Sequence, residues 1–348
     1  MIKRNRFLLL AVAFIVTTYS CRKDNPDDQL NPPITVGTSG GVYITNEGNF
    51  QFGNATVSYY NIVNESVAED LYEAANGNPL GDVCQSMYLF TGKAYVVVNN
   101  SGKIVVVNAT TFEEEAVISG FASPRYFLPV NNSKAYVTDL TSNTISVLNL
   151  TNNSITGSIA ITVWEEELAM VYGKVFVTNV ESDKVYVINA ANDLVEDTIQ
   201  IGYSSNSIKE DKNGKLWVLC AGSQTDGILA SLHRINPVTN TVEQSFQFPN
   251  SSDAPLRLSL NGSNDTLYFL NGSVFQMPIT SADLPETALI EKGSHNFYGI
   301  GIDPNSSTIY VSDAIDYVQR GVIYRYKNDG TLLGSFQAGI IPGNFYFN

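Results

Sequence analysis

The chain has 348 residues, of which 34 are Asp or Glu and 20 are Lys or Arg, so its formal net charge is −14. This acidic balance argues against a nucleic acid as partner, because affinity for a phosphate backbone rests largely on Lys and Arg. A hydrophobic content of 44% argues against disorder, and two His and three Cys leave few candidates for a His-rich metal site or a disulfide framework.

Residues 1–20 have the pattern of a signal peptide, with a basic start and an apolar run at 7–16 that is too short to span a membrane. Ser20 followed by Cys21 resembles a bacterial lipobox, in which cleavage leaves Cys21 as a lipid-carrying first residue. The alternative is a plain secretory signal with an incidental cysteine. We favour the lipoprotein. Cleavage removes three basic residues and no acidic one, so the net charge becomes −14 − 3 = −17.

Residues 21–38 are rich in Pro and Asp, which predicts a flexible tether. Lys23 followed by Asp24 resembles the surface-export signal of one group of Gram-negative lipoproteins. We therefore predict a protein on the cell outer membrane that is surface-exposed and touches the membrane through its lipid anchor alone.

Residues 39–348 contain a repeated unit in which an aromatic residue stands within a short β-rich run. Seven such aromatics recur at intervals of 52, 41, 40, 41, 51 and 42 residues. They are Tyr43, Tyr95, Tyr136, Phe176, Trp217, Tyr268 and Tyr310. Further short runs bounded by Asn, Gly and Ser follow each one, and no stretch has a convincing helical period. Four antiparallel strands about every 40–45 residues are typical of propeller blades, so we predict an all-β, seven-bladed β-propeller of four-stranded blades.

The two chain ends are predicted to share one blade. Residues 341–347 resemble the first strand of a unit, whereas the first copy begins at Gly41 with the second strand. Such sharing pairs the free strand edges and locks the ring. The strand order then places the connections between blades on one face, together with long loops at 46–54, 221–227 and 313–321. We call this the top face.

Long loops that carry aromatic and amide side chains on a rigid scaffold are where ligand binding is expected. Tolerated drift in loop length would explain one long loop, but three on one face favour a site. Loop geometry selects these candidate ligand-binding residues: Asn46, Asn49, Phe50, Arg125, Tyr126, Trp164, Tyr203, Asn206, Gln224, Arg257, Phe297, Tyr298, Tyr317, Arg320 and Asn344.

Catalytic chemistry has little support in the sequence. His233 lies in a predicted strand and His295 in a top connection, without a second His nearby to complete a metal site. The run 165–167 consists of three Glu at the start of an inner strand, where one carboxylate is expected to face the channel. No Gly-rich phosphate loop or EF-hand spacing occurs. We predict no enzymatic activity, no metal and no cofactor, and we interpret Cys84 and Cys220 as small buried residues.

The repeated units resemble YncE-like seven-bladed propellers. Several strings resemble more closely the BtuG-type surface lipoproteins, and these strings lie at 44–51, 54–60, 80–87, 120–126, 313–317 and 339–345. That family captures cobalamin (vitamin B12) outside the cell and sits as a lid over the TonB-dependent transporter BtuB. The resemblance spans the whole propeller. It implies a corrinoid as bound ligand rather than catalytic cofactor, and a BtuB-like outer-membrane transporter as partner.

The top-face residues suit the ligand that this resemblance implies. Aromatic side chains fit a flat corrin ring, and Asn, Gln and Tyr fit its amide arms. Arg125, Arg257 or Arg320 could meet its phosphate. Two alternatives stay open: a surface adhesion or assembly propeller that grips a protein or glycan, and a metal-dependent, lactonase-like hydrolase.

Overall fold

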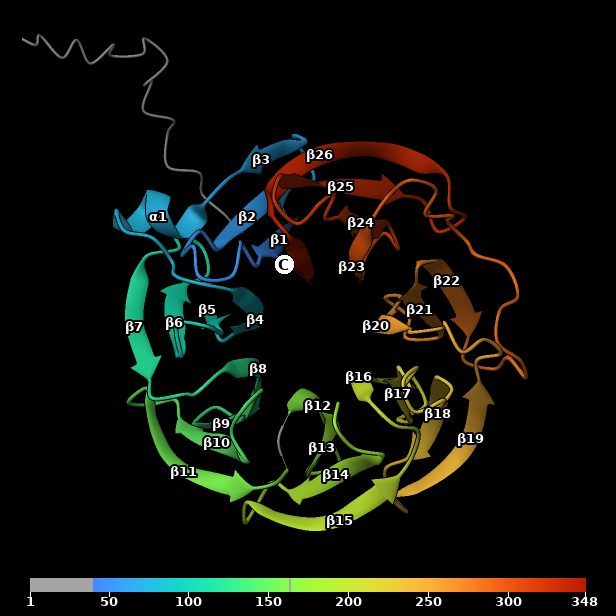
Figure 1. Ribbon diagram of the computed structural model, residues 1–348. Helices are drawn as coiled ribbons and strands as arrows, with labels where there is room; N and C mark the ends of the chain where they lie inside the picture. Colours follow the sequence, from blue (N-terminus) through green and yellow to red (C-terminus); the bar gives the residue numbers. More distant parts are fainter. Residues whose placement is uncertain (1–39, 163) are drawn as a thin grey trace, which may run out of the picture. The chain divides into compact units, whose positions relative to one another are not determined.

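The computed structural model describes residues 40–162 and 164–348, and these residues belong to one compact unit. The predicted signal peptide, the predicted lipid attachment at Cys21 and the predicted tether lie outside the described residues. Over the described part of the chain, seven antiparallel sheets stand around a common axis (Figure 1), which confirms the predicted all-β, seven-bladed propeller. No helix among the described residues has the length and apolar character needed to cross a membrane.

The first four blades have four strands each, numbered below from the channel outwards. Blade 1 contains β27 (Pro342–Phe347), β1 (Gly41–Asn46), β2 (Thr56–Asn61) and β3 (Ser66–Ala68). Blade 2 contains β4 (Cys84–Phe90), β5 (Lys93–Val98), β6 (Lys103–Asn108) and β7 (Glu114–Ser119). Blade 3 contains β8 (Pro124–Asn131), β9 (Lys134–Asp139), β10 (Thr144–Asn149) and β11 (Ser154–Ala160). Blade 4 contains β12 (Glu165–Val171), β13 (Lys174–Asn179), β14 (Lys184–Asn189) and β15 (Leu194–Gln200).

The last three blades differ in their outer edges. Blade 5 contains β16 (Ser205–Glu210), β17 (Leu216–Cys220), β18 (Ser231–Asn236) and β19 (Thr241–Gln247). Blade 6 contains β20 (Leu256–Leu260), β21 (Thr266–Asn271) and β22 (Ser273–Pro278), and an isolated bridge from Val274 to Ile290 stands where its fourth strand would be. Blade 7 contains β23 (Phe297–Ile302), β24 (Ile309–Asp313), β25 (Arg320–Tyr326) and β26 (Leu332–Ile340).

One short helix, α1 (Leu71–Asn76), follows blade 1 and is capped by the Asp70 carboxylate, which accepts from the amide of Glu73. The sequence pattern predicts no helix at this place. Six residues make fewer than two turns, so no periodic apolar pattern could show it.

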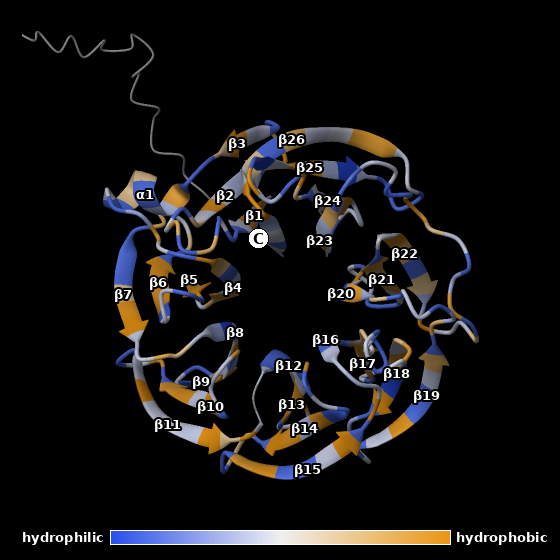
Figure 2. Cartoon of the chain, in the orientation of Figure 1, coloured by the Kyte–Doolittle hydropathy of each residue, from blue (hydrophilic) through white to orange (hydrophobic). Residues whose placement is uncertain are grey.

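The core lies between neighbouring blades. All seven repeat aromatics lie in the second strand of a blade, and all are buried. Apolar clusters combine side chains of two adjacent blades, as Tyr95 of β5 does with Phe127 of β8, whose rings stack at 4.3 Å. The outermost strands β15 and β19 contain both polar and apolar residues and are mostly exposed to solvent. Their mixed colours in Figure 2 show this. Each blade therefore needs both neighbours to bury its faces.

Asn residues end five of the third strands and build the turns that follow. They are Asn61, Asn108, Asn149, Asn189 and Asn236. In each, the side-chain oxygen accepts from the backbone amide two residues further on. This Asx turn fixes the chain reversal and explains why the repeat closes so often on Asn.

The chain ends close the ring as predicted. Strand β27 pairs with β1 through Val42 opposite Phe347 and Ile44 opposite Phe345. The Tyr346 hydroxyl also accepts from the amide of Met87, which ties the C-terminal strand to blade 2 at 2.8 Å. The two cysteines Cys84 and Cys220 are buried and free, as expected of small core residues.

Deletion of residues 342–348 is expected to open the ring. It leaves β1 with an unpaired edge and uncovers apolar surface on blades 1, 2 and 7. We expect a loss of more than about 5 kcal/mol, a large part of the stability of a typical domain. Urea unfolding followed by circular dichroism measures this loss. Deletion of Asn348 alone serves as control, and an unchanged midpoint for the longer deletion would contradict the closure.

Candidate functional site

The same irregularity occurs in all seven innermost strands. Each carries a β-bulge at its top end, where the register with the second strand shifts. A bulge leaves a residue unpaired and re-aims its side chain. The second residue of each innermost strand lies at this shift, and the seven are Gln85, Arg125, Glu166, Asn206, Arg257, Tyr298 and Gly343. We call this set the bulge ring.

The bulge ring surrounds a pocket of about 220 Å³ at the top of the central channel, which we call the upper pocket. Six of the seven ring members line it, together with Glu47, Tyr126, Glu167, Ser207 and Leu256. Two guanidinium groups and three carboxylates thus meet in one partly enclosed space. In such a space charge interactions are stronger than in bulk water.

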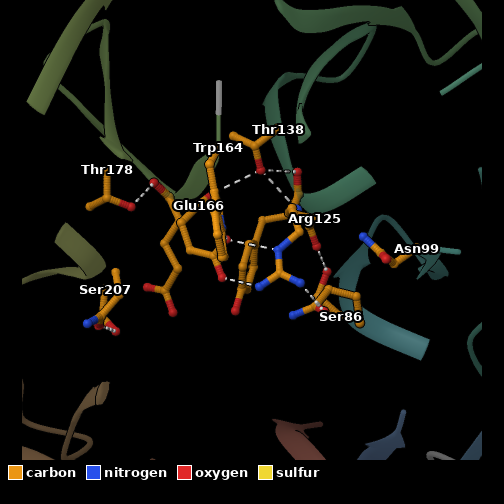
Figure 3. Close-up of polar contacts among 12 residues, drawn as sticks. Ser86, Asn99, Arg125, Thr138, Trp164, Glu166, Thr178 and Ser207 are labelled. Atoms are coloured by element: carbon orange, nitrogen blue, oxygen red, sulfur yellow. Dashed lines mark hydrogen bonds and ion pairs between the residues drawn. The ribbon is translucent and has the colours of Figure 1, made fainter. Parts of the chain in front are cut away.

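Arg125 is held by two neighbouring blades (Figure 3). Its Nε donates to Glu166 Oε2 at 2.9 Å, and its Nη2 pairs with Glu166 Oε1. Its Nη1 donates to Gln85 Oε1 at 2.5 Å. Trp164 adds a hydrogen bond from its indole N–H to Glu166 Oε2 at 3.2 Å. This bidentate arrangement satisfies the fork of the guanidinium and neutralises its charge.

Arg257 lies on the opposite side of the channel and is held more loosely. Its Nη1 donates to Asn344 Oδ1 at 3.0 Å and to the Tyr126 hydroxyl at 3.4 Å. Its Nη2 lies 3.6 Å from Glu47 Oε1, and the guanidinium stands over the Tyr298 ring at 5.3 Å. Arg257 and Tyr126 line both the upper pocket and a second cavity lower in the channel, so we call their contact across the channel a partition between the two.

Glu47 occupies the place left by the seventh ring member. Gly343 has no side chain, and a Cβ there would lie 3.1 Å from Glu47 Oε1. The Tyr298 hydroxyl lies 2.9 and 3.0 Å from the two carboxylate oxygens of Glu47. Burial raises the pKa of Glu47, against the lowering effect of Arg257 and Tyr298. The loop after β1 therefore supplies a carboxylate where the strand supplies none.

The top loops at 46–54 and 313–321 carry exposed apolar side chains beside the upper pocket, and we call this set the rim. Phe50, Phe52 and Val318 are 61%, 77% and 66% exposed. Asn49 Nδ2 donates to the carbonyl of Tyr317 at 2.6 Å, which joins the loop after β1 to the loop after β24. The Tyr317 ring meets the Tyr298 ring edge to face at 5.8 Å, so the rim is continuous with the pocket wall.

The structure brings several predicted site residues together and separates others. Those at the upper pocket and its partition are Arg125, Tyr126, Asn206, Arg257, Tyr298 and Asn344. Trp164 adjoins the pocket through Glu166, and Asn49, Phe50 and Tyr317 belong to the rim. The remaining residues serve other contacts.

Those other contacts involve no residue that lines the upper pocket. Asn46 is buried and bonds Thr56, Ser58 and the amide of Gly339. Gln224 donates to the carbonyl of Ser252, and Arg320 donates to the carbonyl of Ala338 and pairs with Glu69. Phe297 stacks on His295, and the carbonyl of Tyr203 accepts from the amide of Gly222.

Six residues that line the upper pocket are absent from the ligand-binding residues predicted from the sequence, and they are Glu47, Gln85, Glu166, Glu167, Ser207 and Leu256. An alignment of the seven innermost strands would have found Gln85 and Glu166, because both are the second residue of their strand. Glu47 follows β1 and has no equivalent in the repeat. Its role depends on the missing side chain of Gly343.

The two histidines have structural partners. His233 contacts Ser231 and Ser245, and burial lowers its pKa to about 4, so it is neutral at physiological pH. His295 Nδ1 lies 2.8 Å from Asp313 Oδ2. Within residues 40–162 and 164–348, no group of three or more His, Cys, Asp or Glu is placed to hold a metal ion.

The three consecutive Glu at the start of β12 have three different environments. Glu166 pairs with Arg125, and Glu167 pairs with Lys209. Glu165 is fully buried, and its carboxylate has no well-oriented hydrogen-bond partner among the described residues. Burial, with the nearby Asp139 carboxylate, raises the pKa of Glu165 to about 8, which backbone amides only partly oppose.

A family model described as "Domain of unknown function (DUF5074)" matches residues 40–340 of this chain. The chain belongs to this family. No curated protein matches it significantly.

Solved structures with similar folds are diverse. A quinonprotein alcohol dehydrogenase-like protein from Bacteroides thetaiotaomicron is 16% identical with a TM-score of 0.70, over 91% of this chain and 79% of that one. A functionally unknown protein from Desulfotomaculum acetoxidans is 13% identical with a TM-score of 0.65, over 88% and 98%. A putative 6-phosphogluconolactonase from Bacteroides fragilis is 12% identical with a TM-score of 0.63, over 89% and 98%. At these identities the likeness shows the propeller fold alone.

Glu165→Gln is expected to stabilise the protein in a pH-dependent way. Between pH 4.5 and about 8 the unfolded chain has lost the Glu165 proton while the folded chain keeps it, so stability falls as pH rises. Removing the carboxyl group removes this fall, and we expect a gain of roughly 1–3 kcal/mol at pH 8 that vanishes near pH 4. Urea unfolding across this range measures it, with the exposed Glu113→Gln as control. Parallel curves for the variant and the parent would refute the assignment.

Proposed function

We propose that this chain is a non-catalytic capture protein that binds a corrinoid such as cobalamin on its top face. The observation that carries the proposal is the position of the exposed apolar rim directly beside a polar pocket with a loosely held guanidinium. The resemblance to BtuG-type lipoproteins supports the choice of ligand class.

The rim and the upper pocket would contact different parts of such a ligand. A corrin ring is flat and largely apolar at its edges, so it can lie against Phe50 and Tyr317, which are already solvent-exposed. Amide arms can exchange hydrogen bonds with Asn206 and Tyr298 at the pocket mouth.

Of the three arginines predicted from the sequence as partners for the ligand phosphate, Arg257 suits this role best. Glu166 and Gln85 already satisfy Arg125, and Glu69 pairs with Arg320. Arg257 has one hydrogen bond as short as 3.0 Å, and its nearest carboxylate lies at 3.6 Å.

We further propose that lipid on Cys21 holds the protein at the outer surface of the outer membrane, where it delivers the ligand to a TonB-dependent transporter. The signal peptide pattern, the polar tether and the family resemblance support this step. The tether would leave the top face free to meet a transporter.

A second candidate function is a surface propeller that grips a protein. The specific observation in its favour is the number of exposed apolar side chains on the two rim loops, which include Phe52 and Val318. Contiguous exposed apolar side chains mark protein contacts more often than chance. A transporter lid would use the same surface, so the two functions differ in whether a small ligand binds.

Titration calorimetry of the mature protein with cyanocobalamin tests the capture proposal. We expect binding below micromolar concentration, weakened about tenfold by Tyr317→Ala, which corresponds to ~1.4 kcal/mol for loss of one aromatic contact. Tyr172→Ala is the matched control, because Tyr172 is 67% exposed on a turn between first and second strands, away from the top face. If cyanocobalamin does not bind at micromolar concentration, the corrinoid assignment is wrong.

Cys21→Ser is expected to release the protein from the outer membrane, because the thiol that carries the lipid is gone. Fractionation of cells that express the parent and the variant measures the anchored share, and protease accessibility of intact cells reports surface exposure. Ser20→Ala, which keeps a small residue before the cysteine, serves as control. A variant that stays in the membrane fraction would contradict the lipid anchor.

A further inference from the structure

Below the partition formed by Arg257, the central channel widens into a second cavity of about 420 Å³, which we call the lower chamber. It opens toward the face opposite the rim, where the innermost strands end. Its lining combines polar residues with apolar ones, and the partly exposed apolar side chains include Leu168, Leu260 and Phe345. A volume of this size falls in the range of pockets that hold small organic ligands.

The roof of the lower chamber is polar and carries one guanidinium group whose hydrogen-bond donors are not all used. Arg257, Tyr126 and Asn344 line it. Arg257 has five N–H donors, yet its contacts to Tyr126 and the Tyr298 carbonyl are both 3.4 Å long. Arg125, equally buried, makes a bidentate pair and a further bond at 2.5 Å. The difference shows that Arg257 retains capacity for another acceptor.

The counter-ion of Arg257 is also weak. Glu47 lies above the partition at 3.6 Å, beyond hydrogen-bond distance. The single hydrogen of the Tyr298 hydroxyl is shared between the two Glu47 oxygens. Burial raises the pKa of Glu47, and the attraction of Arg257 opposes this only in part. An anion below the partition would therefore meet little competition from Glu47 for the lower side of the guanidinium.

The backbone at this position is strained in a way that aims the side chain at the axis. Arg257 has φ of 61°, in the left-handed region that residues other than Gly rarely adopt. Such conformations persist where the surrounding structure holds them, and they are frequent at binding sites. The surrounding structure of the channel therefore holds the bulge at Arg257 in place.

Among the described residues that line the lower chamber, Arg257 is the cation with the longest ion pair, 3.6 Å to Glu47. Lys209 pairs with Glu167, whose carboxylate also accepts from the amide of Ile208 at 3.1 Å. Glu210 lies at the exposed mouth, where water and salt screen its charge.

We propose that the lower chamber is a binding site for an apolar molecule with one carboxylate. The carboxylate meets the lower side of Arg257 and accepts from the Tyr126 hydroxyl, whose oxygen accepts from Arg257 and whose hydrogen is left to donate. The apolar body lies along Leu168, Leu260 and Phe345, which are only partly buried, and displaces water from them. This site lies apart from the rim and shares only Arg257 with the residues proposed above to contact a corrinoid.

Titration calorimetry with sodium octanoate tests the proposal, with octan-1-ol and octylammonium chloride as uncharged and cationic probes of the same length. We expect octanoate to bind at least tenfold tighter than either. Arg257→Gln should abolish this preference, and Tyr126→Phe should weaken octanoate severalfold, with folding checked by circular dichroism. Equal affinities of the parent for octanoate and octan-1-ol would overturn the anion site.

A filling variant locates the site without touching Arg257. Ser259 lines the lower chamber and is half-buried, so Ser259→Leu should occupy the space and remove octanoate binding. The same variant should bind cyanocobalamin as the parent does, while Tyr317→Ala should leave octanoate binding unchanged. If Ser259→Leu binds octanoate normally, the lower chamber is not the site, whatever the outcome with cyanocobalamin.

Discussion

The pairing of β27 with β1 is the interaction on which the rest of the structure depends. A single blade has two apolar faces and cannot cover either by itself, so every blade relies on its neighbours and the last must reach the first. In this chain the closure is made by backbone hydrogen bonds between its two ends and by Tyr346, which reaches blade 2. Only a closed ring holds seven innermost strands around one axis, and the channel and its pockets exist because of that geometry.

The bulge ring shows how a repeated scaffold acquires a specific site. The same bulge in every innermost strand turns the second residue toward the axis, whatever that residue is. The seven equivalent positions hold two arginines, one glutamate, two amides, one tyrosine and one glycine. The scaffold therefore fixes where side chains meet, while their identity decides the chemistry. The glycine matters as much as the charged members, because its missing side chain admits Glu47.

The sequence predicted the fold well and the site in part, for a physical reason. Burial imposes a repeat on residues such as Tyr43 and Trp217, so the blades and their closure are visible as a period. Pocket residues are under no such constraint. Arg125 and Arg257 could be placed near the top of the channel, but their opposite states of pairing depend on Glu166 and Glu47 in other blades. Contacts across the axis join residues that no local pattern relates, and the helix Leu71–Asn76 is too short to leave one.

The contrast between the two arginines explains how one channel can serve two sites. Arg125 is saturated by Glu166 and Gln85, so it acts as a strut that holds blades 2, 3 and 4 in register. Arg257 spans the channel through long contacts, so it separates two cavities while remaining open to acceptors on either side. In an acidic protein, a buried and loosely paired guanidinium concentrates positive potential at one point of the axis. A partition of this kind can recognise an anionic group from above or from below, but one guanidinium cannot saturate both at once.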